Sequence, residues 1–192
     1  MTKKILVGTH NKGKYQEISS LISKKYKKIS PTSLNIRSPK ATGNTFISNA
    51  KLKANFFSKY VDYPVISDDS GLSIKSLRNN PGVYSARLAK KHGSFFKAMK
   101  HLLKRMKNKK KRDAYFVCCL ALKIKKKLFV VEGRVYGSIS KKILGKNGFG
   151  FDPIFIPKSY KITFGQMLKS KKIKMDHRFI PFSKLKKRFK TL

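Results

Sequence analysis

The chain has 192 residues, with 47 lysines and arginines against 8 aspartates and glutamates, which gives a formal net charge of +39 at pH 7. Because 40% of its residues are hydrophobic and 11% are aromatic, the chain has enough apolar material to form a core. Its composition therefore differs from that of chains that are disordered because they are poor in hydrophobic residues. No apolar run approaches the roughly 18 residues of a membrane span, and the apolar stretch near Met1 is too short for a signal peptide. We therefore expect a soluble, cytoplasmic protein with no membrane partner.

The positive charge first suggests a nucleic-acid-binding module, because lysine and arginine neutralise phosphates whatever the base sequence. The basic residues are spread along the whole chain, however, and only eight of them are arginine, the residue that binds bases and phosphates with two parallel donors. Lysine together with frequent isoleucine, asparagine and phenylalanine is also what AT-rich codons produce. We favour this compositional explanation, and we expect no nucleic acid as a specific partner.

Hydrophobic periodicity and turn residues predict strands that alternate with helices. The expected elements are, in chain order, a strand at Ile5–Gly8, a helix that carries Tyr15, Ile18, Leu21 and Ile22, a loop-rich segment with one short strand at Pro31–Gly43, a helix at Thr45–Tyr60, a strand at Pro64–Ser67, a turn at Asn79–Gly82, a helix at Phe95–Met106, strands at Ala114–Ile124 and Leu128–Ile139, and a stretch at Thr163–Leu192 that is helical in parts and broken by Pro181. This alternation favours an α/β or α+β protein with a mixed sheet. No linker divides the chain, so we expect one domain over residues 1–192.

Two adjacent acids follow the third expected strand. Asp68 and Asp69 stand where that strand is expected to end, just before Ser70 and Gly71. Carboxylates at a strand end can bind Mg²⁺, which takes one or two of them together with substrate phosphates. The alternative is a turn in which one of the acids caps backbone amides.

The first strand-to-helix junction, Thr9–Lys14, is a candidate phosphate site. Backbone N–H groups at a helix start favour anions, Gly13 allows close approach, and Lys14 adds a charge. The spaced glycines of a Walker A loop are missing, so an ordinary capped helix is the alternative.

Two further segments could contact a base. Glycines alternate with aromatic residues in Gly148–Pro153, where rings could flank a planar base, and a β-bulge is the alternative. Asp176–Arg178 places an imidazole beside a guanidinium, which could bind a base edge or a phosphate, although such a pair is more often an ordinary surface feature.

Seven short segments, in this order, carry a family pattern. They are Thr9–Glu17 (T-x-N-x-x-K-x-x-E), Thr42–Phe46 (T-G-x-T-F), Asn49–Ala54 (N-A-x-x-K-A), Ser67–Leu72 (D-D-S-G-L), Pro81–Arg87 (P-G-x-Y-S-A-R), Phe149–Phe155 (F-G-Y-D-P-I-F) and His177–Arg178 (the end of S-H-R). Taken together, they resemble the inosine triphosphate pyrophosphatase family over almost the whole chain. The resemblance implies an elongated, two-lobed mixed-sheet fold with a central cleft, commonly as a homodimer. It also implies Mg²⁺-dependent hydrolysis of non-canonical purine triphosphates (ITP, dITP and XTP) to the monophosphate and pyrophosphate. A related pyrophosphatase with another base preference is a further alternative.

The resemblance also implies roles for individual residues. Asp69 would be the catalytic base and a metal ligand, with Asp68 as the second ligand and Ser70 on the substrate. The triphosphate would be bound by the junction residues with help from Lys172; these residues are Thr9, His10, Asn11, Lys12, Gly13 and Lys14. The base would be enclosed, and its 6-keto oxygen bonded, by Phe149, Gly150, Phe151, Asp152, His177 and Arg178.

The chain departs from the family pattern at three positions. Lys40 and Ala41 stand where the family usually has a glutamate linked to Mg²⁺, Asp176 replaces the usual serine, and Gln166 stands where an acid is common. For Glu17 we expect a pair with Lys14 on the helix surface, three residues away, and a role near the metal is the alternative.

Overall fold

The structure is a computed structural model that describes residues 3–190 and residue 192. Within these residues, the strands form one mixed sheet in the order β2-β1-β3-β5-β6-β7, with β4 paired to β3. The strands are β1 (Lys3–Val7), β2 (Tyr26–Ile29), β3 (Val65–Ile74), β4 (Asn80–Pro81), β5 (Asp113–Ile124), β6 (Lys127–Ile139) and β7 (Phe155–Pro157). The helices are α1 (Lys12–Leu21), α2 (Phe46–Phe57), α3 (Ser85–Lys91), α4 (Phe95–Arg105), α5 (Lys169–Lys172) and α6 (Phe179–Arg188). The expected mixed α/β class is confirmed.

The contacts group the chain into two compact units. The first contains Met1–Asp69, Cys118–Gly133 and Arg178–Leu192, and the second contains Ser70–Val117 and Arg134–His177. Strands β3, β5 and β6 contribute residues to both units. The elongated shape, the central cleft and the homodimer stay predictions. None of the helices among the described residues is long and apolar enough to cross a membrane.

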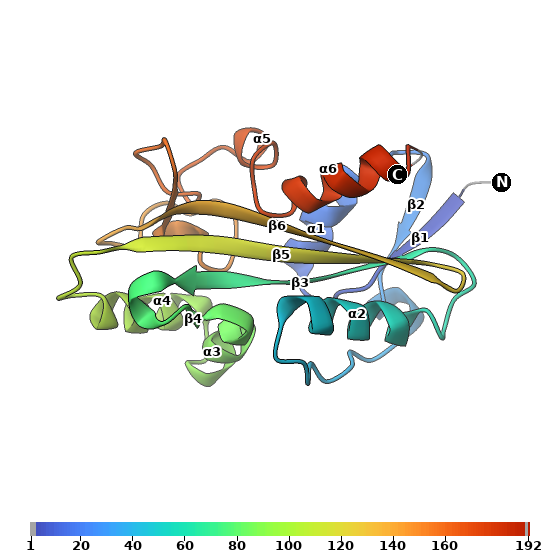
Figure 1. Cartoon of the computed structure of the whole chain (residues 1–192), viewed down its shortest axis with the longest axis horizontal. Helices are drawn as coiled ribbons and strands as arrows, with labels where there is room; N and C mark the ends of the chain where they lie inside the picture. The colour runs from blue at the N-terminus through green and yellow to red at the C-terminus, as the bar shows by residue number, and fades with distance from the viewer. Residues whose placement is uncertain (1–2, 191) are drawn as a thin grey trace. The chain divides into compact units, whose positions relative to one another are not determined.

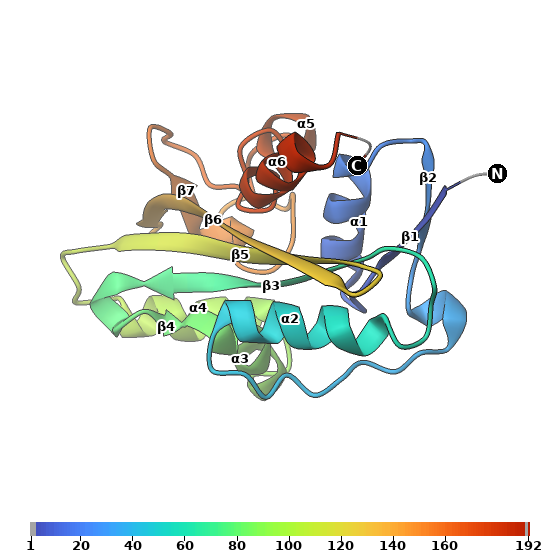
Figure 2. The same cartoon turned by 45° about the vertical axis from the view of Figure 1, so that its right-hand side comes forward.

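In the first unit, helices cover both faces of the sheet. Helices α1 and α6 lie on one face and α2 lies on the other (Figure 1), and the same arrangement is seen after a turn of 45° (Figure 2). Side chains alternate between the two faces along a strand, so Ile5 and Val7 of β1 pack with α1 and α6, whereas Leu6 packs toward α2. Strand β3 follows the same rule: Ile66 belongs to the first cluster and Val65 to the second. This alternation decides where the acids of β3 point.

Several expected elements are confirmed, and others differ. The helix at Thr45–Tyr60 is α2, and the expected pair of long strands is β5 and β6. Strand β3 does not end at Ser67 but runs on through Asp68, Asp69, Ser70 and Gly71 to Ile74. Among the described residues, Pro31–Gly43 forms no strand; β2 precedes it and is rich in lysine.

The C-terminal proline does not break a helix. Pro181 is the third residue of α6, where a missing N–H costs no intrahelical bond. Helix α3 was not expected, because the Pro81–Arg87 segment follows a turn and carries no long apolar period.

The start of α2 is set by a capping box. The Thr45 hydroxyl accepts a bond from the Ser48 N–H at 3.0 Å, and the Ser48 hydroxyl accepts one from the Thr45 N–H at 3.2 Å. Both orphan donors are thereby bonded, which fixes the rotation at which α2 presents its side chains to the sheet.

We predict that Thr45→Ala lowers the free energy of unfolding by about 1 kcal/mol, because the first turn of α2 loses its side-chain acceptor. Urea unfolding measures this change, with Thr42→Ala, an exposed threonine just before the helix, as the matched control. An equal effect of the two substitutions would contradict the role of the cap.

Candidate active site

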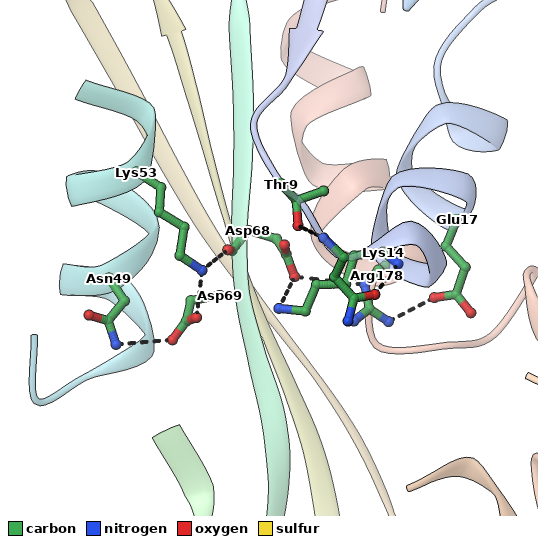
Figure 3. A network of polar contacts seen from close by, with 9 residues as sticks. Thr9, Lys14, Glu17, Asn49, Lys53, Asp68, Asp69 and Arg178 are labelled. Atoms are coloured by element: carbon green, nitrogen blue, oxygen red, sulfur yellow. Dashed lines mark hydrogen bonds and ion pairs between the residues drawn. The ribbon is translucent and has the colours of Figure 1, made fainter. Parts of the chain in front are cut away.

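The two acids of β3 lie on opposite faces of the sheet. Asp68 and Asp69 are consecutive residues in the middle of a ten-residue strand, so their side chains must diverge. Figure 3 shows Asp68 directed toward Lys14 and Arg178, and Asp69 directed toward Asn49 and Lys53 of α2. The expectation that both acids stand at a strand end is wrong, because Ser70 and Gly71 continue the strand.

Asp68 is fully buried and holds two cations. Its Oδ2 lies 3.0 Å from the Lys14 ammonium and 3.8 Å from Nε of Arg178. Desolvation alone would raise the pKa of Asp68, but the positive charges of Lys14, Arg178 and Lys53 together hold that pKa well below its usual range. Asp68 therefore stays ionised at neutral pH, and it is a poor proton acceptor.

Glu17 is buried, and its partner is Arg178 rather than Lys14. Its Oε2 accepts a bond from Nη1 of Arg178 at 2.7 Å. The expected surface pair between Glu17 and Lys14 is therefore wrong. Arg178 is 2% exposed and is engaged by Glu17 and Asp68, whereas we expected it with the segment Phe149–Asp152.

The junction between β1 and α1 is ordered by its own side chains. Asn11 is the N-cap of α1 and accepts a bond from the Lys14 N–H at 3.0 Å, while Oγ1 of Thr9 accepts one from the Asn11 N–H at 3.3 Å. Burial lowers the pKa of Lys14, and the Asp68 carboxylate opposes that shift. His10 is exposed and bonds through Nε2 to the main-chain oxygen of Ile36 at 2.9 Å.

Lys12 and Gly13 form the first turn of α1, where Lys12 is exposed and Gly13 is half-buried. That turn contains no acidic residue, so the helix start presents N–H groups and cationic side chains, a combination that favours an anion.

Asp69 is held by two residues of α2. Its Oδ1 accepts a bond from the Lys53 ammonium at 2.8 Å, and its Oδ2 accepts one from Nδ2 of Asn49 at 3.2 Å. Lys53 also donates to the main-chain oxygen of Asp68 at 2.8 Å. Neither Asn49 nor Lys53 was among the expected site residues, although their spacing of four within the N-A-x-x-K-A segment places them on one helix face.

The site can be tested for a fit to Mg²⁺. Among the described residues, no group of three or more histidine, cysteine or acidic side chains could hold a metal ion. Mg²⁺ needs only one or two carboxylates when phosphates and waters complete its octahedron. Asp69 alone therefore fits an ion that arrives with a polyphosphate. Asp68 faces the other side of β3 and is engaged by Lys14, so the pair does not fit the joint role that we expected.

In the second unit, Asp152 orders the glycine-rich loop. Its Oδ2 accepts bonds from the Phe149 N–H at 2.8 Å and from the Lys172 ammonium at 2.7 Å. Gly148 adopts a left-handed backbone conformation with φ of +73°, and a Cβ there would lie 2.2 Å from Oδ2 of Asp152. The loop can therefore close on the carboxylate only through a glycine.

Lys172 is buried between aromatic rings. Its ammonium lies 5.4 Å from the ring centre of Phe149 and 5.5 Å from that of Phe164. We expected Lys172 to assist in binding the triphosphate, but its contacts place it with Asp152 and the aromatic residues of the loop.

The aromatic and imidazole rings of the second unit are also fixed by packing. Phe151 is buried and meets Phe95 edge-on with ring centres 5.1 Å apart. His177 is 3% exposed and stacks on Phe116 with ring centres 4.5 Å apart and planes 11° from parallel. Asp176 is fully buried, so the alternative of an ordinary surface pair at His177–Arg178 is wrong.

Gly150 has a left-handed φ of +66°, and Ser70 is half-buried in β3 next to Asp69. The substrate-binding roles expected of Ser70, Gly150 and the other residues of these segments stay predictions.

Fold and site together define a mixed α/β protein in which a two-sided network of carboxylates and cations crosses the sheet beside a cationic helix start. The chain belongs to the Ham1 family, whose model matches residues 5–188. This match confirms the family resemblance that the motifs carry.

Curated relatives match over nearly their whole length. A dITP/XTP pyrophosphatase of Caulobacter vibrioides is 38% identical over 189 residues, covering 97% of each chain. A dITP/XTP pyrophosphatase of Haemophilus influenzae is 36% identical over 192 residues, covering 97% of this chain and 98% of the relative.

Solved structures agree. The Staphylococcus aureus Ham1 protein has a TM-score of 0.87 at 32% identity and 98% coverage of both chains. A nucleoside-triphosphatase / dITP/XTP pyrophosphatase of Mycobacterium abscessus has a TM-score of 0.75 at 34% identity, covering 95% of this chain and 98% of the other.

We predict that Asp68→Asn lowers the free energy of unfolding at pH 7 by roughly 3 kcal/mol, because Lys14 and Arg178 lose a buried counter-charge. The pKa of Asp68 is lower in the folded than in the unfolded chain, so its contribution is present above about pH 4 and is lost as the pH falls further. The difference between wild type and variant should therefore shrink below about pH 4.

Urea unfolding at pH 7 and pH 3 measures both effects, and Asp62→Asn, at an exposed acid of the same unit, is the control. A difference that does not depend on pH would contradict the assignment of a charge-holding role to Asp68.

Proposed function

We propose that this protein is a nucleoside triphosphate pyrophosphatase that hydrolyses non-canonical purine nucleotides, such as dITP, XTP and ITP, to the monophosphate and pyrophosphate. The observation that carries the proposal is the Asp69 carboxylate, held by Lys53 and Asn49 at the edge of the cationic network. Membership of the Ham1 family and the names of the curated relatives support the substrate class.

Asp69 is the residue that acts on water. Each carboxylate oxygen has two acceptor positions, so one bond from Lys53 or Asn49 leaves room for a water molecule. Asp69 accepts a proton from that water while the water oxygen forms a bond to the α-phosphorus. The bond between this phosphorus and the oxygen that bridges to the β-phosphate breaks, and pyrophosphate leaves with the electron pair. Asp68 is unsuited to this role because its pKa is well below the usual range.

Cationic groups bind the triphosphate. Lys14 and the N–H groups at the start of α1 attract phosphate oxygens, and Lys53 neutralises charge beside Asp69. Glu17 and Asp68 fix the guanidinium of Arg178, which keeps a buried positive charge in a defined place. Mg²⁺, when bound with the substrate at Asp69, supplies further charge neutralisation at the phosphates.

Discrimination between bases is assigned to the second unit. In hypoxanthine and xanthine a keto oxygen replaces the 6-amino group of adenine, so a donor there favours these bases and leaves a donor facing a donor with adenine. His177 is our candidate donor, because the Phe116 ring fixes its plane. The loop Phe149–Asp152, closed on its own carboxylate, supplies flat aromatic surface.

We predict that the protein releases pyrophosphate from dITP, ITP and XTP far faster than from ATP, because the 6-amino group of adenine would face a donor, and only with Mg²⁺. A pyrophosphate-release panel over these nucleotides, with and without Mg²⁺, measures this. Release of inorganic phosphate instead, or equal rates with inosine and adenine nucleotides, would contradict the proposal.

We predict that Asp69→Asn reduces kcat for dITP by about 100-fold or more, because the water loses its proton acceptor. Asp113→Asn, at an exposed acid of the other unit, serves as the control and should keep wild-type activity. A folded Asp69→Asn variant with wild-type turnover would remove Asp69 from the chemistry.

A further inference from the structure

We propose that Asn49 is a positioning residue for this reaction: it sets the orientation of the Asp69 carboxylate by joining it to the backbone of the loop that precedes α2. The catalytic consequence rests on the proposed function, whereas the link itself is a property of the fold.

The direction of the Asn49 amide is decided by its partners. Asn49 is 1% exposed, and its Oδ1 accepts a bond from the Gly43 N–H at 2.8 Å. A backbone N–H can only donate, so the oxygen of the amide must face Gly43, and Nδ2 must face Asp69, 3.2 Å away. The orientation is thus fixed by chemistry, and Asn49 presents a donor to the carboxylate.

Both oxygens of Asp69 are bonded from the same helix. Asn49 donates to Oδ2 and Lys53 donates to Oδ1, and the two residues lie one turn apart on α2. With one donor on each oxygen, rotation of the carboxylate about its bond to Cβ breaks at least one hydrogen bond. Lys53 has a long, flexible stem and donates to Asp68 as well, whereas the short Asn49 side chain is anchored at both ends. Asn49 is therefore the more restrictive of the two partners.

The loop itself is tightly closed on α2. A Cβ at Gly43 would lie 2.2 Å from Oγ of Ser48 and 2.8 Å from Oδ1 of Asn49, so a side chain at this position would push the loop away from the helix. Ser48 is also part of the capping box with Thr45. The loop, the start of α2 and the Asp69 carboxylate are therefore connected to one another through Asn49.

Substitutions can separate the two ends of the link. Asn49→Asp keeps an oxygen for the Gly43 N–H but replaces the donor to Asp69 by a second acceptor, whereas Asn49→Ala removes both bonds. Asn55→Ala, at an exposed asparagine of the same helix, is the matched control.

We expect Asn49→Asp and Asn49→Ala to lower kcat for dITP about 10- to 100-fold, the effect of one lost hydrogen bond to a charged group, with KM little changed. Asn55→Ala should match the wild type. Wild-type kcat in both Asn49 variants would overturn the proposal. A lowered kcat combined with a raised KM and a lowered Tm in both variants would also overturn it, because such a pattern indicates a general loss of structure.

A second measurement does not depend on activity. In ¹H–¹⁵N NMR spectra, Asp69→Asn should shift the side-chain amide resonances of Asn49, and Asp62→Asn should not. Unchanged Asn49 resonances in Asp69→Asn would overturn the link. If the wild type released no pyrophosphate from any purine triphosphate, the proposed function would fail, and these resonances would still decide whether the link exists.

Discussion

The alternation of side chains along β3 is the constraint on which the site depends. Because Asp68 and Asp69 are neighbours within a continuous strand, they face opposite sides of the sheet and cannot share one set of counter-charges. Helix α1 and the residue before α6 supply Lys14 and Arg178 to one side, and α2 supplies Lys53 to the other. This separation gives the two acids different partners: Asp68 lies beside Lys14 and Arg178 inside the protein, and Asp69 is bonded by α2.

The chain has a net charge of +39 and only eight acids, so the positions of these acids are informative about its sites. Five of its eight acids are buried, and these are Glu17, Asp68, Asp69, Asp152 and Asp176. A buried carboxylate is stable only with charged or hydrogen-bonding partners, and four of the five, all but Asp176, form ion pairs with buried or half-buried cations. Most lysines instead lie on the surface. Several of them line a hollow of about 750 Å³ in the second unit. Such charges attract polyanions over a range of about 8 Å at physiological salt.

Much of the fold and part of the site could be predicted from the sequence, and the failures have physical causes. Local signals predicted α1, α2 and the long β5–β6 pair, because the spacing of apolar residues and the capping residues can be recognised within a short stretch of sequence. The partner of Glu17 is 161 residues away, so local spacing suggested Lys14 instead. Ser70 and Gly71 suggested a strand end, but pairing within the sheet carries β3 through them. The lysines of β2 mask the apolar pattern of a strand. The bonds from Asn49 and Lys53 to Asp69 depend on the packing of α2 against β3, which local sequence patterns do not indicate.

The central claim is that water held by Asp69 attacks the α-phosphorus of a non-canonical purine triphosphate. Hydrolysis of dITP in ¹⁸O-labelled water, followed by mass spectrometry of both products, tests it most directly. The account predicts that the label appears in the deoxyinosine monophosphate and that the pyrophosphate is unlabelled. Label in the pyrophosphate would mean attack at the β-phosphorus and would contradict the account.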